Sequence, residues 1–427
     1  MKRVLIITYY WPPSGGAGVQ RWLKFAKYLP EFGWEPIILT VDPKYASYAQ
    51  YDESLEQEVN PDLKVYRTKS FEFYNLYKKL SGKNEIPYGG FANEKKTTFA
   101  GKFSRFIRGN FFIPDPRKGW NKQAYQKAQE LIGKYNIKTV ITTSPPHSTQ
   151  LIGLKLKKKF NMNWIADFRD PWTDIYYYKT LYHSPLAKKI DLHLERKILN
   201  NADSILTVSK DIARSFTKKT NKLSAKKIQV ITNGFDTDDF LNIKEEKEEK
   251  FVITYTGTMS EAYDLSGFIR ALSMLNSELR KKVKLRFVGK PFHPILSKIR
   301  KLLPEIELEI PGYVEHSESI LFLMRSNLQL LVIPNVSDNR GIITGKFYEY
   351  LASQKPILAI GPRGGDLEEL IEETKCGLIT DYKDSKTIKQ WLIKQMNQPT
   401  GKIEENNSKK YSRRELTKKL SDILKQF

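Results

Sequence analysis

The sequence predicts an α/β protein with two doubly wound domains, each built on a parallel sheet. Short apolar runs alternate along the whole chain with segments whose apolar residues recur at helical spacing. With 427 residues, of which 40% are hydrophobic, the chain is long enough to bury about two cores. Strands that alternate with helices in this way form open parallel sheets covered by helices on both faces.

The expected strands form two sets. In the first half they are residues 3–8, 35–41, 138–143, 162–168, 203–209 and 227–234. In the second half they are residues 251–257, 283–289, 306–312, 328–334, 355–361 and 376–380. Helical patterns such as 19–29 and 187–200 lie between them. We therefore expect a first domain over residues 1–240 and a second over 251–395.

Three segments break this alternation. Residues 241–250, LNIKEEKEEK, are highly charged and predict a solvated linker. The terminal residues 396–427 carry a helical pattern that either covers the surface or packs back on the first domain. Residues 70–120 interleave aromatic and basic residues and look like an insertion. A basic segment rich in Phe is typical of an element that contacts an anionic membrane, and a surface helix whose Phe face joins the core is the alternative.

The charge and the cysteine content narrow the functional classes. The formal net charge of +23 predicts an anionic partner, which is a nucleic acid, a phosphorylated substrate or an anionic membrane. The single cysteine, Cys376, excludes an internal disulfide and a cysteine-based zinc cluster, which fits a reducing compartment. No apolar run approaches the roughly 18 residues of a membrane span, and the start resembles no signal peptide. We expect a cytoplasmic protein.

A loop rich in glycine follows the first expected strand. Gly15, Gly16 and Gly18 remove side chains where a parallel sheet binds its ligands, outside the carboxyl ends of the strands. A helix that begins there would direct its free N–H groups and its positive dipole end at an anion or a sugar. The spacing is not G-x-G-x-x-G, so a tight turn without a ligand remains the alternative.

Polar residues also follow later strands of the first domain. His147 comes after a strand and starts a helix, where it would face the same crevice, although a lone histidine is often structural. The stretch ADFRDPWTD holds Asp167, Arg169, Asp170 and Trp172 beyond another strand. Carboxylates, a guanidinium and an indole together suit a polyol, and a local ion pair that caps a helix is the alternative.

The second domain carries a pattern that describes a nucleotide site. Arg340 and Lys346 lie near an expected helix start, where they can neutralise phosphate oxygens. Glu349, one turn beyond Lys346, can accept hydrogen bonds from vicinal ribose hydroxyls. A solvated Lys and Glu pair on a helix surface is the alternative.

An ordered set of motifs resembles the retaining family 4 glycosyltransferases of the GT-B fold. The motifs run from residue 3 to about 385, and they are GGAGVQRWLKFAKYLPEFGWEPIILT, PPHST, ADFRDPW, ADSILTVS, ITNGFD, YTGTMS, VGK and TGKFYEYLASQKPILAIG. The resemblance implies two Rossmann-like domains that face each other across a cleft. The second would hold a nucleotide-sugar and the first an acceptor. It places Gly15 and Gly16 near the donor phosphate, makes His147 the active-site histidine, and assigns Glu349 to the ribose.

The sequence departs from the family pattern at two places. The first glutamate of the family's pair falls on Gly341, and the basic pair expected after the YTG strand is replaced by residues such as Met259 and Asp264. Diphosphate neutralisation is therefore expected from Arg340, Lys346 and Lys290. The motifs DFRDPW and TGKFYEYLAS are similar to those of a branch that builds bacterial surface polysaccharides, which implies a glycan or lipid-linked acceptor.

These observations give one assignment of roles. We expect His147, Asp170 and Gly16 to be catalytic, and Asp167, Arg169 and Trp172 to bind the acceptor. We expect the donor to be bound by Gly15, Gly16, Gly257, Lys290, Arg340, Thr344, Lys346 and Glu349. We expect no cofactor, since the nucleotide-sugar is itself a substrate, and no metal, since His183 and His193 are ten residues apart and lack ligand partners in the sequence. We expect a location at the inner face of the cell membrane.

Two alternatives stay open. One is a GT-B enzyme of different chemistry, such as a nucleotide-sugar epimerase or a phosphorylase. The other is a basic nucleic-acid-binding protein. The basic residues are spread over helices such as residues 155–160 without a recognised nucleic-acid-binding module, so we expect no nucleic acid partner.

Overall fold

The computed structural model divides the chain into two compact units, which are described separately. It describes residues 1–48, 50–71, 99–241, 243, 248–398 and 405–427. The first unit comprises Met1–Thr232 and Arg413–Phe427, and the second comprises Asn233–Ser412. The division falls after Thr232, ahead of residues 241–250, where the sequence predicts a linker. Residues 72–98 of the expected insertion, and half of the expected linker, lie outside the described residues.

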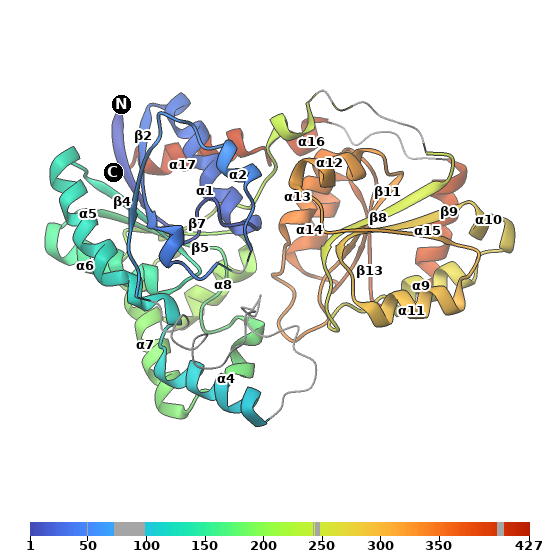
Figure 1. Ribbon diagram of the computed structural model, residues 1–427, viewed down its shortest axis with the longest axis horizontal. Coiled ribbons are helices and arrows are strands. Elements are labelled where there is room, and N and C mark those ends of the chain that lie inside the picture. Colours follow the sequence, from blue (N-terminus) through green and yellow to red (C-terminus); the bar gives the residue numbers. More distant parts are fainter. Residues whose placement is uncertain (49, 72–98, 242, 244–247, 399–404) are drawn as a thin grey trace. The chain divides into compact units, whose positions relative to one another are not determined.

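The first unit is built on a sheet of seven parallel strands in the order β3-β2-β1-β4-β5-β6-β7 (Figure 1). The strands are β1 Lys2–Ile7, β2 Trp34–Val41, β3 Lys64–Thr68, β4 Thr139–Ser144, β5 Asn163–Phe168, β6 Ser204–Thr207 and β7 Ile228–Val230. In β1, Val4 and Ile6 are buried on one face of the sheet, while Leu5 and Ile7 are buried on the other. Both faces are therefore covered, as the near-continuous apolar runs predict.

Helices cover both faces of this first sheet. They are α1 Ala17–Tyr28, α2 Ser54–Gln57, α4 Phe99–Phe111, α5 Asn121–Tyr135, α6 Ser148–Phe160, α7 Pro185–Asn201, α8 Lys210–Lys219 and α17 Arg413–Leu424. Short 3₁₀ turns lie at Leu29–Phe32, Pro43–Tyr45, Pro116–Trp120, Tyr176–Leu181 and Ala225–Lys227. Buried residues of α1 and α17 pack on the face that holds Val4, and those of α5 and α6 pack on the face that holds Leu5.

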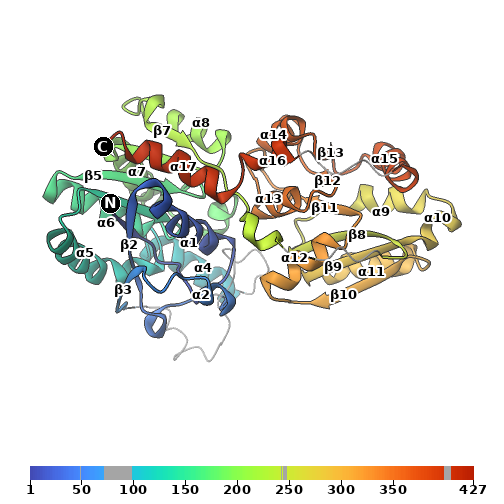
Figure 2. The ribbon, with the colours of Figure 1, turned by 90° about the horizontal axis from the view of Figure 1, so that it is seen from above.

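The last helix, α17, belongs to the first unit. Leu416, Leu420 and Leu424 are buried in the same cluster as Trp22 of α1, and Figure 2 shows the two helices side by side. Arg414 also forms an ion pair with Glu31 at 2.6 Å. The apolar spacing at the end of the sequence is therefore explained by burial against α1, whereas α16 Glu405–Lys409 belongs to the second unit.

The second unit is built on six parallel strands in the order β10-β9-β8-β11-β12-β13. The strands are β8 Phe251–Thr258, β9 Val283–Lys290, β10 Glu307–Gly312, β11 Leu328–Val332, β12 Ile357–Ile360 and β13 Gly377–Thr380. The helices are α9 Ser266–Ser273, α10 Ser277–Lys281, α11 His293–Leu302, α12 His316–Met324, α13 Gly345–Ala352, α14 Asp366–Thr374 and α15 Ser385–Asn397, and a 3₁₀ turn lies at Thr237–Phe240. One face packs on α9, α11 and α15, and the other on α12, α13 and α14.

The fold agrees with the expected pair of Rossmann-like domains, with two differences in detail. The strand β3 was not expected, because Lys64–Thr68 lies at the sheet edge and consists of exposed and half-buried residues instead of an apolar run. Glu248, at the end of the expected linker, binds Lys284 at 3.1 Å and also pairs with Arg286, both in β9. This end of the segment is thus attached to the second sheet.

Candidate functional site

The glycine loop of the first unit joins the end of β1 to the start of α1. Gly16 has a φ of +101°, a conformation that favours glycine, and no side chain caps the helix that follows it. Gly15 is held by a hydrogen bond from its N–H to the carbonyl oxygen of Gln50 at 2.9 Å. The uncapped first turn of α1 therefore presents backbone N–H groups, the donors that an anion or a sugar oxygen would need.

Arg169 connects this loop with the loop that precedes α6. A Cβ atom on Gly18 would lie 1.7 Å from Nη1 of Arg169, so the guanidinium lies directly against the glycine. The same guanidinium donates from Nη2 to the carbonyl oxygen of Pro145 at 3.0 Å. Burial raises the pKa of the neighbouring Asp170 carboxyl, and the positive charge of Arg169 opposes this increase. The structure thus brings Gly18, Arg169 and Asp170 together at the carboxyl ends of β1 and β5.

Asp167 does not face this site, which corrects the assignment of its side chain to the acceptor. The residue is fully buried. Its carboxylate accepts hydrogen bonds from Nη2 of Arg21 at 3.0 Å, from Nε1 of Trp22 at 2.9 Å and from Oγ1 of Thr143 at 2.8 Å. These partners satisfy a buried charge and tie α1 to β4 and β5, so Asp167 stabilises the first unit.

His147 lies at the start of α6 and is 9% exposed. Its ring stacks on the indole of Trp172, with centroids 4.9 Å apart and an angle of 9° between the planes. Burial, with help from the charges of Lys219 and Arg169, lowers the pKa of His147 to about 3. The imidazole is therefore neutral near pH 7, and its buried Nδ1 has no hydrogen-bond partner among the described residues.

Trp172 is only 2% exposed, which corrects its expected role as a surface for the acceptor sugar. One face of the indole is taken up by His147, and its Nε1 donates to Oδ1 of Asp191 in α7 at 2.8 Å. The indole therefore lies within the domain and stacks on His147.

In the second unit, Lys346 of α13 lies beside the aromatic rings of Tyr255 and Tyr263. Its Nζ donates a hydrogen bond to the hydroxyl of Tyr255 at 2.6 Å and lies 4.3 Å from the centroid of that ring. Burial lowers the pKa of Lys346 to about 7, although the charge of Glu349 opposes the decrease. An ammonium group held among aromatic rings has few compensating charges, so an anion would be stabilised beside it.

Gly257 makes this placement of Lys346 possible. It has a φ of +96°, and an added Cβ would lie 2.7 Å from Cε of Lys346. Its register partner in β9, Gly289, has a φ of +108°, and a Cβ there would lie 2.7 Å from the carbonyl oxygen of Gly257. Gly257 therefore leaves room for the Lys346 side chain, and Gly289 lets β9 approach the backbone of Gly257 closely.

The start of α13 adds further polar groups to the site. Thr344 occupies the N-cap position, but its side chain makes no capping bond, and its buried Oγ1 has no partner among the described residues. Arg340 and Lys290 are exposed, and the structure joins neither side chain to Lys346. The carbonyl oxygen of Arg340 accepts from the N–H of Asp366, which holds the loop against α14.

Glu349 faces a residue that the sequence interpretation missed. Its Oε1 lies 3.2 Å from Nε2 of His316, the first residue of α12. His316 follows the strand β10 and starts a helix, the same arrangement that singled out His147 in the first domain. The comparison with His147 could therefore have identified His316 from the sequence.

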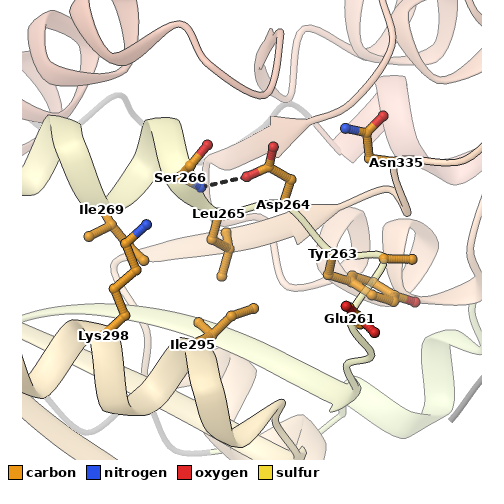
Figure 3. A pocket seen from close by; sticks show the side chains of 10 residues that line it. Glu261, Tyr263, Asp264, Leu265, Ser266, Ile269, Ile295, Lys298 and Asn335 are labelled. Atoms are coloured by element: carbon orange, nitrogen blue, oxygen red, sulfur yellow. Dashed lines mark hydrogen bonds between the residues drawn. The ribbon is translucent and has the colours of Figure 1, made fainter. Parts of the chain in front are cut away.

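A pocket of about 330 Å³ lies between the segment that follows β8 and the helices α9 and α11 of the second unit (Figure 3). Tyr263 lines it and also lies 5.9 Å from Nζ of Lys346, measured to the ring centroid. Glu261, Asp264 and Asn335 supply most of its polar lining, with Lys298 opposite them. Asp264 accepts from the N–H of Ser266 at 2.8 Å. Carboxylate and amide oxygens suit hydroxyl groups better than phosphate oxygens.

Among the described residues, no helix combines the length and the apolar character that crossing a membrane requires.

The described part of each unit offers donors, acceptors and aromatic rings at the carboxyl ends of its parallel sheet, the usual position of ligands in such folds.

Comparisons with known proteins agree with the fold. Residues 90–239 match the family profile described as Glycosyltransferase Family 4, and residues 236–415 match Glycosyl transferases group 1. A search among curated proteins finds no match by sequence.

Similar solved structures cover the whole chain at low sequence identity. A sucrose-phosphate synthase from Thermosynechococcus elongatus is 14% identical, with a TM-score of 0.64, over 100% of this chain and 99% of its own. HepE of Anabaena in complex with UDP and glucose is 13% identical, with a TM-score of 0.61, over 100% of both chains. WaaG, a glycosyltransferase involved in lipopolysaccharide biosynthesis, is 13% identical, with a TM-score of 0.54, over 98% of this chain and 99% of its own. At these identities the likeness concerns the fold.

Proposed function

Because the chain belongs to the family 4 glycosyltransferases of the GT-B fold, we propose that it transfers a sugar from a nucleotide-sugar to a glycan or lipid-linked acceptor in bacterial polysaccharide biosynthesis. The observation that carries this proposal is the placement of Lys346 at the start of α13, under Gly257 and one turn before Glu349. A partly buried cation, free helix N–H groups and a carboxylate at this spacing suit a diphosphate and the ribose attached to it.

The donor would lie on the second unit. Lys346 and the N–H groups at the start of α13 would bind diphosphate oxygens, together with the unpartnered hydroxyl of Thr344. Arg340 and Lys290 are exposed and would reach the phosphates from the loops after β11 and β9. Glu349 would accept from the ribose hydroxyls while His316 holds its other side. HepE was solved with UDP, which makes UDP the first nucleotide to test.

The reaction would retain the configuration at the anomeric carbon. The bond from that carbon to the diphosphate oxygen breaks, and a bond to the acceptor oxygen forms on the same face. The acceptor hydroxyl gives its proton to the departing phosphate oxygen. The charge that develops on the diphosphate would be stabilised by Lys346 and by the first turn of α13, the kind of fixed electrostatic contribution that dominates many enzymatic rates.

The first unit would orient the acceptor. His147 is neutral near pH 7, because burial holds its pKa at about 3, so it would position sugar hydroxyls by hydrogen bonding rather than remove a proton. Arg169 and Asp170 lie between the glycine loop and the loop before α6 and would bind further hydroxyls. The N–H groups that follow Gly15 and Gly16 would contact the donor phosphate or the acceptor.

Contact with an anionic membrane at the inner face of the cell membrane is part of the proposal. Asn110 at the end of α4 donates to the carbonyl oxygen of Tyr182 and accepts from the N–H of Ser184, so this end of α4 adjoins the start of α7. Exposed apolar side chains among the described residues of α4, of α7 and of the segment just before α7 include Phe106, Phe111, Tyr182, Leu186 and Ile190. Residues 99–111 contain no acidic residue, and Lys102, Lys188 and Lys189 are exposed.

Vesicle sedimentation tests the membrane contact. We expect the protein to bind vesicles with phosphatidylglycerol more strongly than vesicles of phosphatidylcholine alone, and the double variant Phe106→Ser, Leu186→Ser to lose most of this binding. Tyr313→Ser, which changes an exposed ring in the second unit, serves as the control. Equal binding by the double variant and the wild type would remove the membrane contact from the proposal.

A thermal-shift screen against nucleoside diphosphates and nucleotide-sugars tests the transferase assignment. A ligand that binds only the folded protein raises its melting temperature, so the true donor should give the largest shift. Glu349→Ala should abolish that shift, while Glu372→Ala, at an exposed position of α14, should leave it intact. In a separate incubation with the nucleotide-sugar alone, interconversion of the sugar without release of nucleotide would favour an epimerase instead.

A further inference from the structure

A single buried carboxylate organises the aromatic residues around His147. Asp191 of α7 is 2% exposed, and both of its oxygens are used. Oδ1 accepts from Nε1 of Trp172 at 2.8 Å, and Oδ2 accepts from the hydroxyl of Tyr178 at 2.9 Å. A carboxylate that satisfies two different ring donors in the interior fixes the position of both rings.

Each of these rings is in turn stacked on a histidine. The indole of Trp172 lies parallel to the imidazole of His147, with centroids 4.9 Å apart and planes at 9°. The phenol of Tyr178 lies against His183, with centroids 4.0 Å apart and planes at 13°. The hydrogen bond to Asp191 prevents the indole from sliding or turning, so the plane of Trp172 determines the plane in which His147 can lie.

We propose that Asp191 is a positioning residue for the transfer reaction, which acts through Trp172 to hold the imidazole of His147 in the orientation that meets the acceptor. The inference rests on the proposed role of His147 in binding the acceptor. Asp191 itself has no part in the chemistry, because its oxygens are both occupied and it is buried behind the indole. A displacement of about 1 Å in a positioned group can cost about a hundredfold in rate.

The chemistry of the site supports a positioning role for this carboxylate. An amide in its place could accept from only one of the two ring donors through its oxygen, and its NH₂ group would face the other donor. Burial raises the pKa of Asp191 to about 6, while the hydrogen bonds from Tyr178 and Trp172 oppose the increase. Keeping a carboxylate in such a place costs folding free energy, which a purely apolar side chain would avoid.

The same helix offers a matched control. Glu195 lies one turn beyond Asp191 and is fully buried. It binds Nζ of Lys219 at 2.7 Å and Oγ1 of Thr173 at 2.6 Å, and neither of these atoms belongs to Trp172 or Tyr178. Glu195→Gln therefore perturbs a buried carboxylate of α7 without removing a hydrogen bond of Trp172 or Tyr178, and it can reach His147 through the charge of Lys219. Asp191→Asn perturbs the stack directly.

Histidine NMR on the full chain tests the coupling without any substrate. The chain has five histidines, and His147→Gln assigns the signal of His147 in protein labelled at the imidazole Cε1 position. We expect Asp191→Asn and Tyr178→Phe to move this signal, because the support of the ring above it changes, while Glu195→Gln moves it less. Tyr178→Phe keeps its ring and removes only the hydroxyl that donates to Asp191, so it still answers the question if Asp191→Asn does not fold.

Kinetics with the donor found by the thermal-shift screen tests the functional consequence. Release of nucleoside diphosphate in the presence of acceptor should show a kcat lowered by at least about tenfold in Asp191→Asn, with the KM for the donor unchanged. An unmoved His147 signal, an unchanged kcat, or an equal effect of Glu195→Gln would each overturn the inference. If the chain binds no nucleotide, the proposed function fails instead, and the NMR result still shows whether Asp191 positions His147.

Discussion

The Nζ of Lys346 and the hydroxyl of Tyr255 lie 2.6 Å apart, and the same hydroxyl donates onward to the carbonyl oxygen of Thr258 at 2.9 Å. Because that donation uses the proton of the hydroxyl, its oxygen lone pairs face the lysine. Tyr255 and Tyr263 present their rings to Nζ, and Glu349 is the charged neighbour on the same helix. The start of α13 thus holds a cation that has few compensating negative charges when no ligand is bound.

The affinity for a nucleoside diphosphate should therefore depend on pH through Lys346. Its pKa is lowered to about 7 by burial, and a bound diphosphate would raise it again, so binding above pH 7 should take up as much as one proton. We expect the affinity to fall by up to about tenfold for each pH unit above 7. Calorimetry in two buffers of different ionisation enthalpy measures the uptake. Lys346→Met should remove both effects, and Lys282→Met, at an exposed position, should remove neither.

Replacement of Tyr255 by Phe should weaken the donor site. The variant keeps the ring beside Lys346 but leaves its Nζ without this acceptor, which should cost about 1–3 kcal/mol in the free energy of unfolding. Urea unfolding measures this change, and calorimetry should show weaker binding of the diphosphate. Tyr313→Phe, at an exposed ring, is the control. Unchanged stability and affinity in Tyr255→Phe would contradict the described role of the hydroxyl.

Two glycines should respond in opposite ways to alanine. In Gly18→Ala the new Cβ would meet Nη1 of Arg169 at 1.7 Å, so the guanidinium must leave the loop, at a cost of about 1–3 kcal/mol. In Gly133→Ala the new Cβ meets no atom within 4 Å on the exposed side of α5, and stability should rise by about 0.5–1 kcal/mol. Urea unfolding of both variants provides the comparison. A neutral Gly18→Ala would show that Arg169 does not need its place against the glycine.

The neutral state of His147 should make the protein sensitive to acid. Its folded pKa of about 3 lies below the ordinary value of 6.5, so between these values the unfolded chain binds a proton that the folded chain does not. The contribution to stability is therefore present above pH 6.5 and is lost as the pH falls, by up to about 1.4 kcal/mol for each unit. His147→Gln should reduce this slope, whereas His193→Gln, at an exposed position, should not. Equal slopes in all three proteins would contradict the buried, neutral imidazole.

The sequence predicts the fold well because apolar strand runs are a direct consequence of sheets buried on both faces. All six strands of the second unit coincide with expected runs, and only the edge strand β3 was missed. The positions of the polar side chains were harder to predict from the sequence. Asp167 and Asp170 are three residues apart and look alike in sequence, yet one is buried under α1 and the other lies beside Arg169.

The missed features depend on contacts between residues far apart in the chain. The contact of Arg169 with Gly18, the stack of Trp172 on His147 and the pairing of His316 with Glu349 each join separate elements of one unit. Spacing along a helix or strand carries no information about such contacts, whereas Lys346 and Glu349 share one helix turn and were found together. Local pattern therefore predicts the pairing of Lys346 and Glu349 on one helix, and only packing brings His316 to Glu349.

A crystal structure of the chain with the nucleoside diphosphate that gives the largest thermal shift would test the central claim most directly. The account predicts pyrophosphate oxygens at hydrogen-bond distance, about 3 Å, from Nζ of Lys346 and from the first N–H groups of α13, with the ribose hydroxyls at Glu349. A nucleotide bound elsewhere, with Lys346 still directed only at Tyr255 and Glu349 only at His316, would contradict it.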